Sequence, residues 1–187
     1  MEQLTAYFCR MGFSQADAAA IAACFSLRPL SRGDYFVQEG HMADQIAYVA
    51  TGMLRYYSLS IEGEERTTYI SRPDTFVASL LSYLTGAPAR EYICALADTD
   101  IWVIHKTDVL ALQQQIPAFK DFYITLIEWQ VCCIDKSKFD LIALSAEQRY
   151  EKIMREEPEL IRLVPLQYIA SMIGVTPRHL SRLRHKS

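Results

Sequence analysis

The spacing of hydrophobic residues changes twice along the chain, and the first stretch has the period of a helix. Between residues 2 and 25, apolar side chains recur every three or four positions. Ser14 can cap a helix over Gln15–Phe25, because its hydroxyl can accept a hydrogen bond from a backbone N–H of the first turn. The chain is therefore expected to begin with helices. The apolar positions that define this period are Ala18, Ile21, Ala22 and Phe25.

From Leu27 to Lys106 the pattern becomes one of short segments rich in Tyr, Val, Ile and Thr, separated by turn residues. Regular short strands of this kind predict a β-sandwich or barrel. Met53–Thr68 resembles a hairpin with Gly63 at the left-handed turn position, and Phe76–Leu84 is expected to be a short helix. The expected strands are Tyr35–Gln38, Gln45–Thr51, Met53–Ser60, Glu65–Ser71, Glu91–Ala97 and Asp100–His105.

The last part of the chain returns to helical spacing. Thr107 is expected to cap a short helix over residues 107–116, and Pro117 suits the first turn of a long helix over about Ala118–Leu141. Its apolar stripe must be buried, and we favour a parallel homodimer seam over packing on the chain's own domain. The residues near an a/d register are Phe119, Tyr123, Leu126, Gln130, Cys133 and Ser137, with Phe122, Ile127, Ile134 and Leu141 beside them.

A capping box of Ser145 and Gln148 is expected to start a further helix, which runs to about Glu157 and ends before Pro158. The residues after it have the packing skeleton of a helix-turn-helix. Ala170 is small enough for a second helix to approach closely, and Gly174 suits a helix end that needs positive φ. Thr176 and Pro177 can start the second helix. The expected buried face consists of Ile169, Ile173, Leu180 and Leu183.

The charges are distributed unevenly between this motif and the rest of the chain. All 22 acidic residues lie within residues 1–160, together with 14 of the 19 basic ones, which gives that part a net charge of −8. The remaining 27 residues contain five basic residues and no acidic one. A basic segment on an acidic body is typical of phosphate binding, because Lys and Arg displace counterions condensed on DNA. A merely solvated tail is the alternative.

Composition argues against several other classes of protein. With 51% hydrophobic and 22% charged residues, the chain is of ordinary globular type. It shows no signal peptide and no apolar run that could span a bilayer, so it is expected to be cytoplasmic, with no membrane partner. The five cysteines lack metal-ligand spacing, and no His-x-His pair or catalytic triad is visible. We therefore predict no metal site, no catalytic residue and no enzyme.

With these features, nearly the whole chain resembles the Crp/Fnr family of regulators, named after the cAMP receptor protein. The long helix after Pro117 resembles the family's dimerisation helix, and the C-terminal motif resembles its DNA-reading helix pair. The resemblance implies an N-terminal double-stranded β-helix, or jelly roll, of the cyclic-nucleotide-binding type. The β-region matches the family at Gly33-Asp34, Glu39-Gly40, Ala47-Tyr48-Val49, Gly52 and Arg55.

The resemblance also implies partners and contact residues. The expected partners are double-stranded DNA, a second copy of the chain and RNA polymerase. Arg178 and Arg182 are the candidates for base contacts, because Arg can bond guanine O6 and N7 together. Gln167, on the first helix of the pair, is expected to touch phosphate. The residues expected near the DNA backbone are Thr176, Pro177, Ser181 and Arg184.

Effector contacts fall, by the same resemblance, on Ser79, Leu80 and Arg90. The family's cassette for cyclic nucleotides has Gly-Glu where this chain has Ala78-Ser79. Arg90 lies one position from the family's arginine, and a slip of one residue turns a strand side chain to the opposite face. The sequence therefore does not favour a cyclic nucleotide, and no cofactor is predicted with certainty. A site for another anion and a surface ion pair with Glu91 or Asp98 stay open for Arg90.

We therefore predict an α+β protein with three parts. Residues 1–116 form the β-roll sensor domain, residues 117–142 the dimerisation helix, and residues 143–187 the helix-turn-helix domain. Little sequence follows the second helix of the motif, so a full β-wing is expected to be lacking. The predicted function is that of a DNA-binding transcription regulator of Crp/Fnr type, which senses an unknown small effector. The alternative is a ligand- or protein-binding sensor whose DNA binding is lost or weak.

Overall fold

Two antiparallel four-stranded sheets form the centre of the molecule in the computed structural model, which describes residues 1–184. They pack face to face around Leu54, Ile93 and Ile101, with Ala47, Val49 and Val103 beside them. This arrangement confirms the predicted jelly roll. The first sheet has the order β1 (Ser26–Leu30), β8 (Thr99–His105), β3 (Gln45–Val49), β6 (Thr75–Val77). The second has the order β2 (Tyr35–Val37), β7 (Tyr92–Ala95), β4 (Leu54–Leu59), β5 (Glu65–Ile70).

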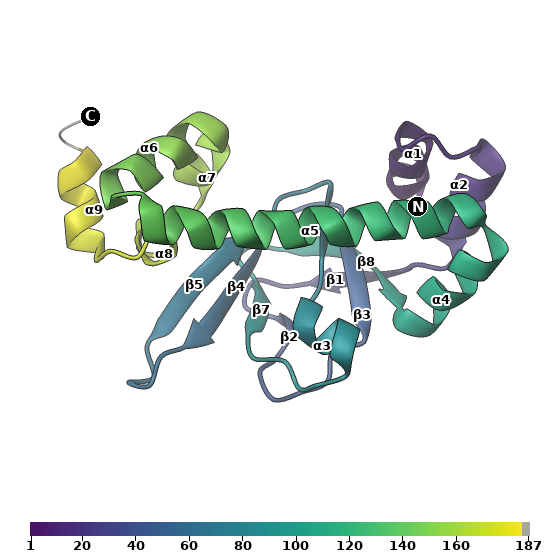
Figure 1. Ribbon diagram of the computed structural model, residues 1–187, viewed down its shortest axis with the longest axis horizontal. Helices are drawn as coiled ribbons and strands as arrows, with labels where there is room; N and C mark the ends of the chain where they lie inside the picture. The colour runs from purple at the N-terminus through teal and green to yellow at the C-terminus, as the bar shows by residue number, and fades with distance from the viewer. Residues whose placement is uncertain (185–187) are drawn as a thin grey trace.

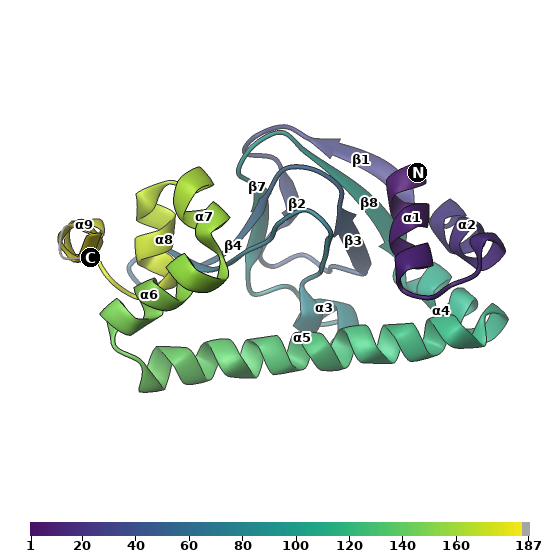
Figure 2. The same cartoon turned by 90° about the horizontal axis from the view of Figure 1, so that it is seen from above.

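The helices surround this roll on one side and at both ends. The long helix α5 runs along the whole molecule, with α1, α2 and α4 at one end and α6 to α9 at the other (Figure 1). Seen from above, every other element lies on one side of α5 (Figure 2). The helices are α1 (Glu2–Arg10), α2 (Gln15–Ala23), α3 (Leu80–Thr85), α4 (Lys106–Gln115), α5 (Pro117–Ala143), α6 (Ala146–Glu156), α7 (Pro158–Leu163), α8 (Leu166–Met172) and α9 (Pro177–Arg184).

Several local signals in the sequence produce the predicted structure. The Ser14 hydroxyl accepts a hydrogen bond from the Asp17 amide at 3.1 Å at the start of α2. Ser145 and Gln148 form the predicted capping box of α6, with bonds of 3.2 and 2.9 Å. Gly63 has φ +79° in the turn between β4 and β5. Each of these features depends on residues close together in the chain.

Other predicted boundaries are wrong. Strand β1 was not predicted, because Pro29 lies in it and four of its five residues are exposed, as an edge strand allows. Thr75–Val77 is a strand, so the predicted helix over Phe76–Leu84 begins only at Leu80. Helix α4 begins at Lys106, which places Thr107 inside it and makes His105 the N-cap.

The predicted end of a helix at Pro158 is also incomplete, because this proline opens the additional helix α7. Proline is tolerated in the first turn, where its missing N–H has no helical partner to lose. The helix buries Leu160 in the same cluster as Tyr150 and Ile169. Helices α6 to α9 thus share one small core.

The packing of α5 corrects the predicted seam register. Phe119 is buried, and Tyr123, Leu126, Gln130 and Cys133 are half-buried, while Ser137 is exposed. Leu126 and Gln130 contact the cavity beside α3, so this side of α5 faces the chain's own roll. Several exposed apolar residues of α5 lie on a neighbouring stripe. That stripe includes Ile124, Val131, Ile134 and Leu141.

Aromatic packing fixes the start of α5 to the rest of the molecule. Phe8 of α1 lies with its ring centroid 6.4 Å from that of Phe119 and 5.5 Å from that of Phe122. Phe76 of β6 is 6.1 Å from Phe122. The N-terminal helices and the roll therefore share one core with the long helix. Among residues 1–184, no helix combines the length and hydropathy of a membrane span.

Candidate DNA-binding surface and effector site

The helix-turn-helix is formed by α8, a tight turn and α9. Gly174 has φ +74° at the end of α8, and its amide donates to the Ser171 carbonyl at 3.0 Å. The Thr176 hydroxyl caps α9 by accepting a bond from the His179 amide at 3.2 Å. Both signals were predicted from the sequence. The expected hydrophobic skeleton is buried, with exposed fractions between 0% and 8% at Ile169, Ala170, Ile173, Leu180 and Leu183.

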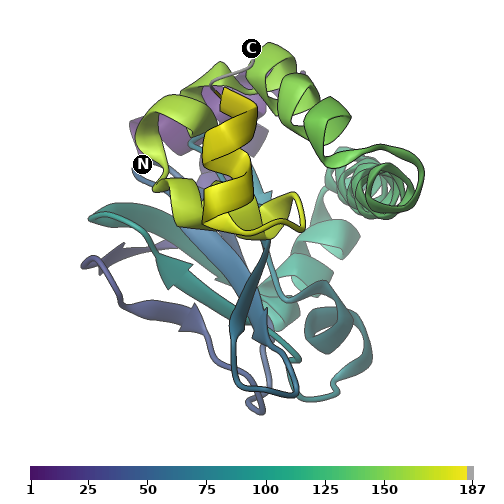
Figure 3. The same ribbon diagram turned by 90° about the vertical axis from the view of Figure 1, so that its left-hand side faces the viewer.

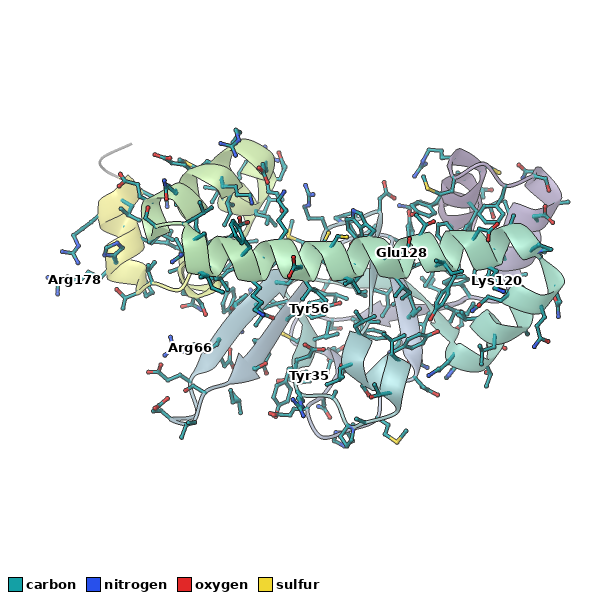
Figure 4. All side chains as sticks on the ribbon, viewed as in Figure 1. Tyr35, Tyr56, Arg66, Lys120, Glu128 and Arg178 are labelled. Carbon is teal, nitrogen blue, oxygen red and sulfur yellow. The ribbon has the colours of Figure 1, made fainter. Side chains whose placement is uncertain are left out.

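Helix α9 presents its basic residues to solvent at the outer end of the molecule. It faces the viewer in front of the roll when the molecule is seen from that end (Figure 3). Arg178 extends away from the body (Figure 4). Arg178, Arg182 and Arg184 are exposed, and none of them forms an ion pair with an acidic residue in the described part of the chain. Their charges are therefore available to an anionic partner.

The predicted DNA-contact residues share one end of the molecule. Thr176 and Pro177 are exposed at the start of α9, Ser181 is half-buried one turn further, and Gln167 is exposed on α8. Their roles in DNA contact stay predictions. Lys186, the last basic residue of the predicted basic tail, lies outside the described residues.

Contacts that the sequence did not predict join the helix-turn-helix to the roll. The Thr67 amide of β5 donates to the Ser171 hydroxyl of α8 at 2.8 Å. Arg72 lies 3.3 Å from Glu157, where α6 meets α7. These pairs are 104 and 85 positions apart, so no local pattern could have indicated them.

The three predicted effector residues occupy different environments. Ser79 precedes α3 and is 1% exposed, and its hydroxyl has no hydrogen-bond partner in the described structure. Leu80 is half-buried as the first residue of α3. Arg90 is exposed before β7, and its side chain forms no ion pair with Glu91 or Asp98 in residues 1–184. Of the two alternatives for Arg90, the surface ion pair is therefore contradicted.

A tyrosine side chain binds the backbone at the position of the family's phosphate cassette. The Tyr56 hydroxyl accepts a hydrogen bond from the Ala78 amide at 3.1 Å and lies 3.4 Å from the Ala78 carbonyl. Burial raises the pKa of Tyr56 well above its ordinary value, so the hydroxyl stays neutral. The amide just before Ser79 is thus already satisfied within the protein.

The surroundings do not fit a cyclic nucleotide. The cavity between β6, α3 and α5 measures about 30 Å³ and is lined mainly by apolar residues such as Val77, Leu126 and Ile127. Such a volume corresponds to about one water molecule. Ser79 stands where the family has the acidic side chain that binds the ribose. The Ala78 amide already donates to Tyr56 and so is not free to bind a phosphate. A larger open cleft of about 700 Å³ lies between β1 and β2, but none of the predicted effector residues lines it.

Comparison with known proteins agrees with this architecture. Residues 27–115 match the family model of the cyclic nucleotide-binding domain. No curated protein matches the chain. The similarity to known families at the level of sequence therefore lies in the roll and α4.

Solved structures resemble the chain over most of its length. FixK2 from Bradyrhizobium japonicum has a TM-score of 0.74 at 15% identity, covering 87% of this chain and 83% of its own. CLP of Xanthomonas campestris, a c-di-GMP-responsive global regulator, has a TM-score of 0.73 at 14% identity, covering 92% and 91%. The catabolite activator protein of Thermus thermophilus has 0.61 at 20%, covering 94% and 84%.

A jelly roll, a long helix and a helix-turn-helix follow one another in this chain, and the similar solved structures share this order of parts. Residues 27–115 resemble the cyclic nucleotide-binding domain whose family model they match, and the chain as a whole has the fold of the Crp/Fnr regulators. The resemblance seen in the sequence is thereby confirmed.

Proposed function

We propose that this protein is a DNA-binding transcription regulator of Crp/Fnr type, in which the roll senses a small effector and α9 reads DNA. The observation that carries the proposal is the surface of α9. It combines a capped N-terminus with three exposed arginines that pair with no acidic residue among residues 1–184, on the helix at the outer end of the molecule. Arginines on such a helix suit both phosphate and guanine.

The long helix supports a homodimer. The exposed stripe on α5 consists of Ile124, Val131, Ile134 and Leu141, which are seven, three and seven residues apart and so lie on one side of the helix. Ile134 is 50% exposed and Val131 52%, so the single chain leaves a row of apolar side chains in water. Two copies packed along this stripe would bury it as a parallel seam. The seam would place the two α9 helices at the same end of the dimer, related by its two-fold axis.

The effector of the roll is a small molecule other than a cyclic nucleotide. Ser79 offers a buried hydroxyl that has no hydrogen-bond partner among residues 1–184, and Arg90 offers a positive charge at the surface. An effector can act only by binding one arrangement of the dimer more tightly than another. The expected place of action is the cytoplasm, with RNA polymerase as the further partner.

Selection of DNA by the purified full-length chain tests the proposal. A pool of random duplexes is passed over the protein, the retained sequences are enriched, and their affinity is measured by fluorescence anisotropy in a salt series. Each phosphate that an arginine neutralises contributes about −0.9 to the slope, so the logarithm of the association constant should fall linearly against the logarithm of salt concentration. Absence of any enriched sequence would favour the alternative, a sensor without DNA binding.

A further inference from the structure

The outer face of the second sheet holds a buried arginine where the helix-turn-helix meets the roll. Only 4% of the Arg55 side chain is exposed. Its Nε donates to the Thr67 hydroxyl at 2.9 Å, and its Nη1 lies 2.5 Å from the Glu65 carboxylate. Both partners lie on β5, the strand against which α8 packs. The roll therefore fixes the orientation of the guanidinium through its own side chains.

Two tyrosine rings complete the surroundings of this guanidinium. The Arg55 Cζ lies 4.5 Å from the ring centroid of Tyr57, on the same strand, and 4.0 Å from that of Tyr168 on α8. A guanidinium is planar and weakly hydrated, so it stacks on aromatic rings, and the attraction increases where water is excluded. Tyr168 thus connects a fixed cation of the roll to the first helix of the DNA-binding motif.

The contacts between α8 and β5 differ in whether they fix the orientation of α8. Ile70 of β5 shares a hydrophobic cluster with Ile169 and Ala170 of α8, but apolar burial has no preferred direction. The stacking of Tyr168 on Arg55 and the hydrogen bond from the Thr67 amide to the Ser171 hydroxyl do have a preferred direction. They specify how α8 lies on β5. Since α8 and α9 share one buried core, they specify the orientation of α9 as well.

We propose that Arg55 is a positioning residue for DNA recognition, because its stacking on Tyr168 sets the orientation of the helix-turn-helix on the roll. This inference rests on the proposed function. Two-fold symmetric DNA binding requires recognition helices about 34 Å apart, one turn of the double helix. If the helix-turn-helix could slide on the roll, the distance between the two recognition helices would vary, and only some of the dimers would match the DNA. The docked arrangement leaves the arginines of α9 exposed, so it favours binding rather than blocking it.

Methionine variants of two arginines on the same hairpin test this role in the full-length chain. Arg55→Met removes the buried cation but keeps an unbranched side chain. Arg66→Met is the matched control, because the Arg66 side chain is 59% exposed and pairs only with Glu64 among the described residues. A second pair addresses the ring: Tyr168→Leu removes the aromatic face, whereas Tyr168→Phe retains it. Circular dichroism and thermal unfolding confirm that each variant folds.

Two measurements decide the outcome. Without DNA, amide exchange of Thr67 should be about fivefold faster or more in Arg55→Met and Tyr168→Leu, and unchanged in Arg66→Met and Tyr168→Phe. With the selected operator, the first two variants should bind about fivefold more weakly or worse, while affinity for random duplexes stays the same. Equal operator affinity of the two methionine variants would overturn only the role of Arg55. Failure of the wild-type chain to select any duplex would reject the proposed function itself.

Discussion

Arg55 and Tyr56 are neighbours on β4, yet their side chains contact opposite sides of the second sheet. Arg55 stacks on Tyr168 of the helix-turn-helix, whereas the Tyr56 hydroxyl binds the amide of Ala78, just before α3. Successive side chains of a strand point to opposite faces, so this arrangement follows from the pleat of β4. One short strand therefore links the region of the predicted effector contacts to the proposed DNA-binding unit.

Replacement of Tyr56 by Phe should destabilise the roll. The change keeps the ring but leaves the Ala78 amide without its acceptor. A buried donor that loses its partner costs about 1–3 kcal/mol, and the free energy of unfolding should fall by that amount in urea titrations. Tyr35→Phe is the control, because Tyr35 is 37% exposed and its hydroxyl, 3.1 Å from that of Tyr57, can bond water instead. Equal stability of Tyr56→Phe and the wild type would show that the bond to Ala78 contributes nothing.

Substitution of Arg182 by Ala should weaken operator binding by about 1–3 kcal/mol if this residue reads a base. Loss of affinity should also be greater for the operator than for unrelated duplexes, because base contacts carry the sequence information. Arg162→Ala serves as the control, since Arg162 is equally basic but lies on α7 and pairs with Glu159 at 2.6 Å. Anisotropy titrations of both variants against the selected duplex measure the difference. If Arg162→Ala and Arg182→Ala bind alike, Arg182 takes no part in base readout.

Cyclic nucleotides should not stabilise the protein. A ligand at a hundredfold excess over its Kd adds about 2.7 kcal/mol to the free energy of unfolding, which raises the melting midpoint by several degrees. With the amide of Ala78 occupied by Tyr56, we expect cAMP and cGMP to leave the midpoint unchanged in thermal-shift assays. Arg90→Ala provides the decisive comparison. A rise in the wild type that disappears in this variant would mean that Arg90 belongs to a working cyclic-nucleotide site.

The parts of the fold that sequence reasoning predicted are those that depend on near neighbours. Ser145 and Gln148 are three residues apart, and Thr176 caps the helix that it precedes, so their chemistry is visible in the chain. The edge strand β1 escaped prediction because Pro29 and its exposed neighbours lack the alternation of a buried strand. Its pairing with β8, whose residues lie 69 to 77 positions further on, supplies the order that its own residues do not indicate.

The same limit explains what was missed at the candidate site. The period of α5 predicted that one stripe must be buried, but it could not tell which stripe faces the roll and which faces solvent. Leu126 packs inward only because the cavity wall of β6 and α3 lies beside it. Likewise, Arg55 was noticed as a family match in the β-region, while its partner Tyr168 lies 113 positions away. Contacts between domains depend on docking, which local patterns do not encode.

A charge placed on the exposed stripe of α5 should separate the proposed dimer. Ile134→Glu puts a carboxylate into the apolar seam, where it would be buried without a partner. Thr125→Glu adds the same charge to an exposed position of the same helix outside the stripe. Light scattering after gel filtration should give twice the 21.4 kDa chain mass for the wild type and Thr125→Glu, and about half that value for Ile134→Glu. A dimer that survives Ile134→Glu would place the interface elsewhere.

Buried tyrosines should make the fold sensitive to alkali. Burial and the hydrogen bond to Asp74 raise the pKa of Tyr48 above its ordinary value of 10.0, so the folded state favours the neutral phenol. The stability that this provides is present in full below pH 10 and is lost as the pH rises, because the unfolded chain releases the proton first. Each such tyrosine should lower the free energy of unfolding by about 1.4 kcal/mol per pH unit above pH 10. Urea titrations between about pH 8 and 11 extend one unit above the ordinary pKa of tyrosine. In that last unit, Tyr48→Phe should make the fall in the free energy of unfolding smaller by the contribution of one tyrosine. An identical slope in the variant would mean that Tyr48 ionises equally well in the folded protein, which its burial against Tyr7 and Phe76 opposes.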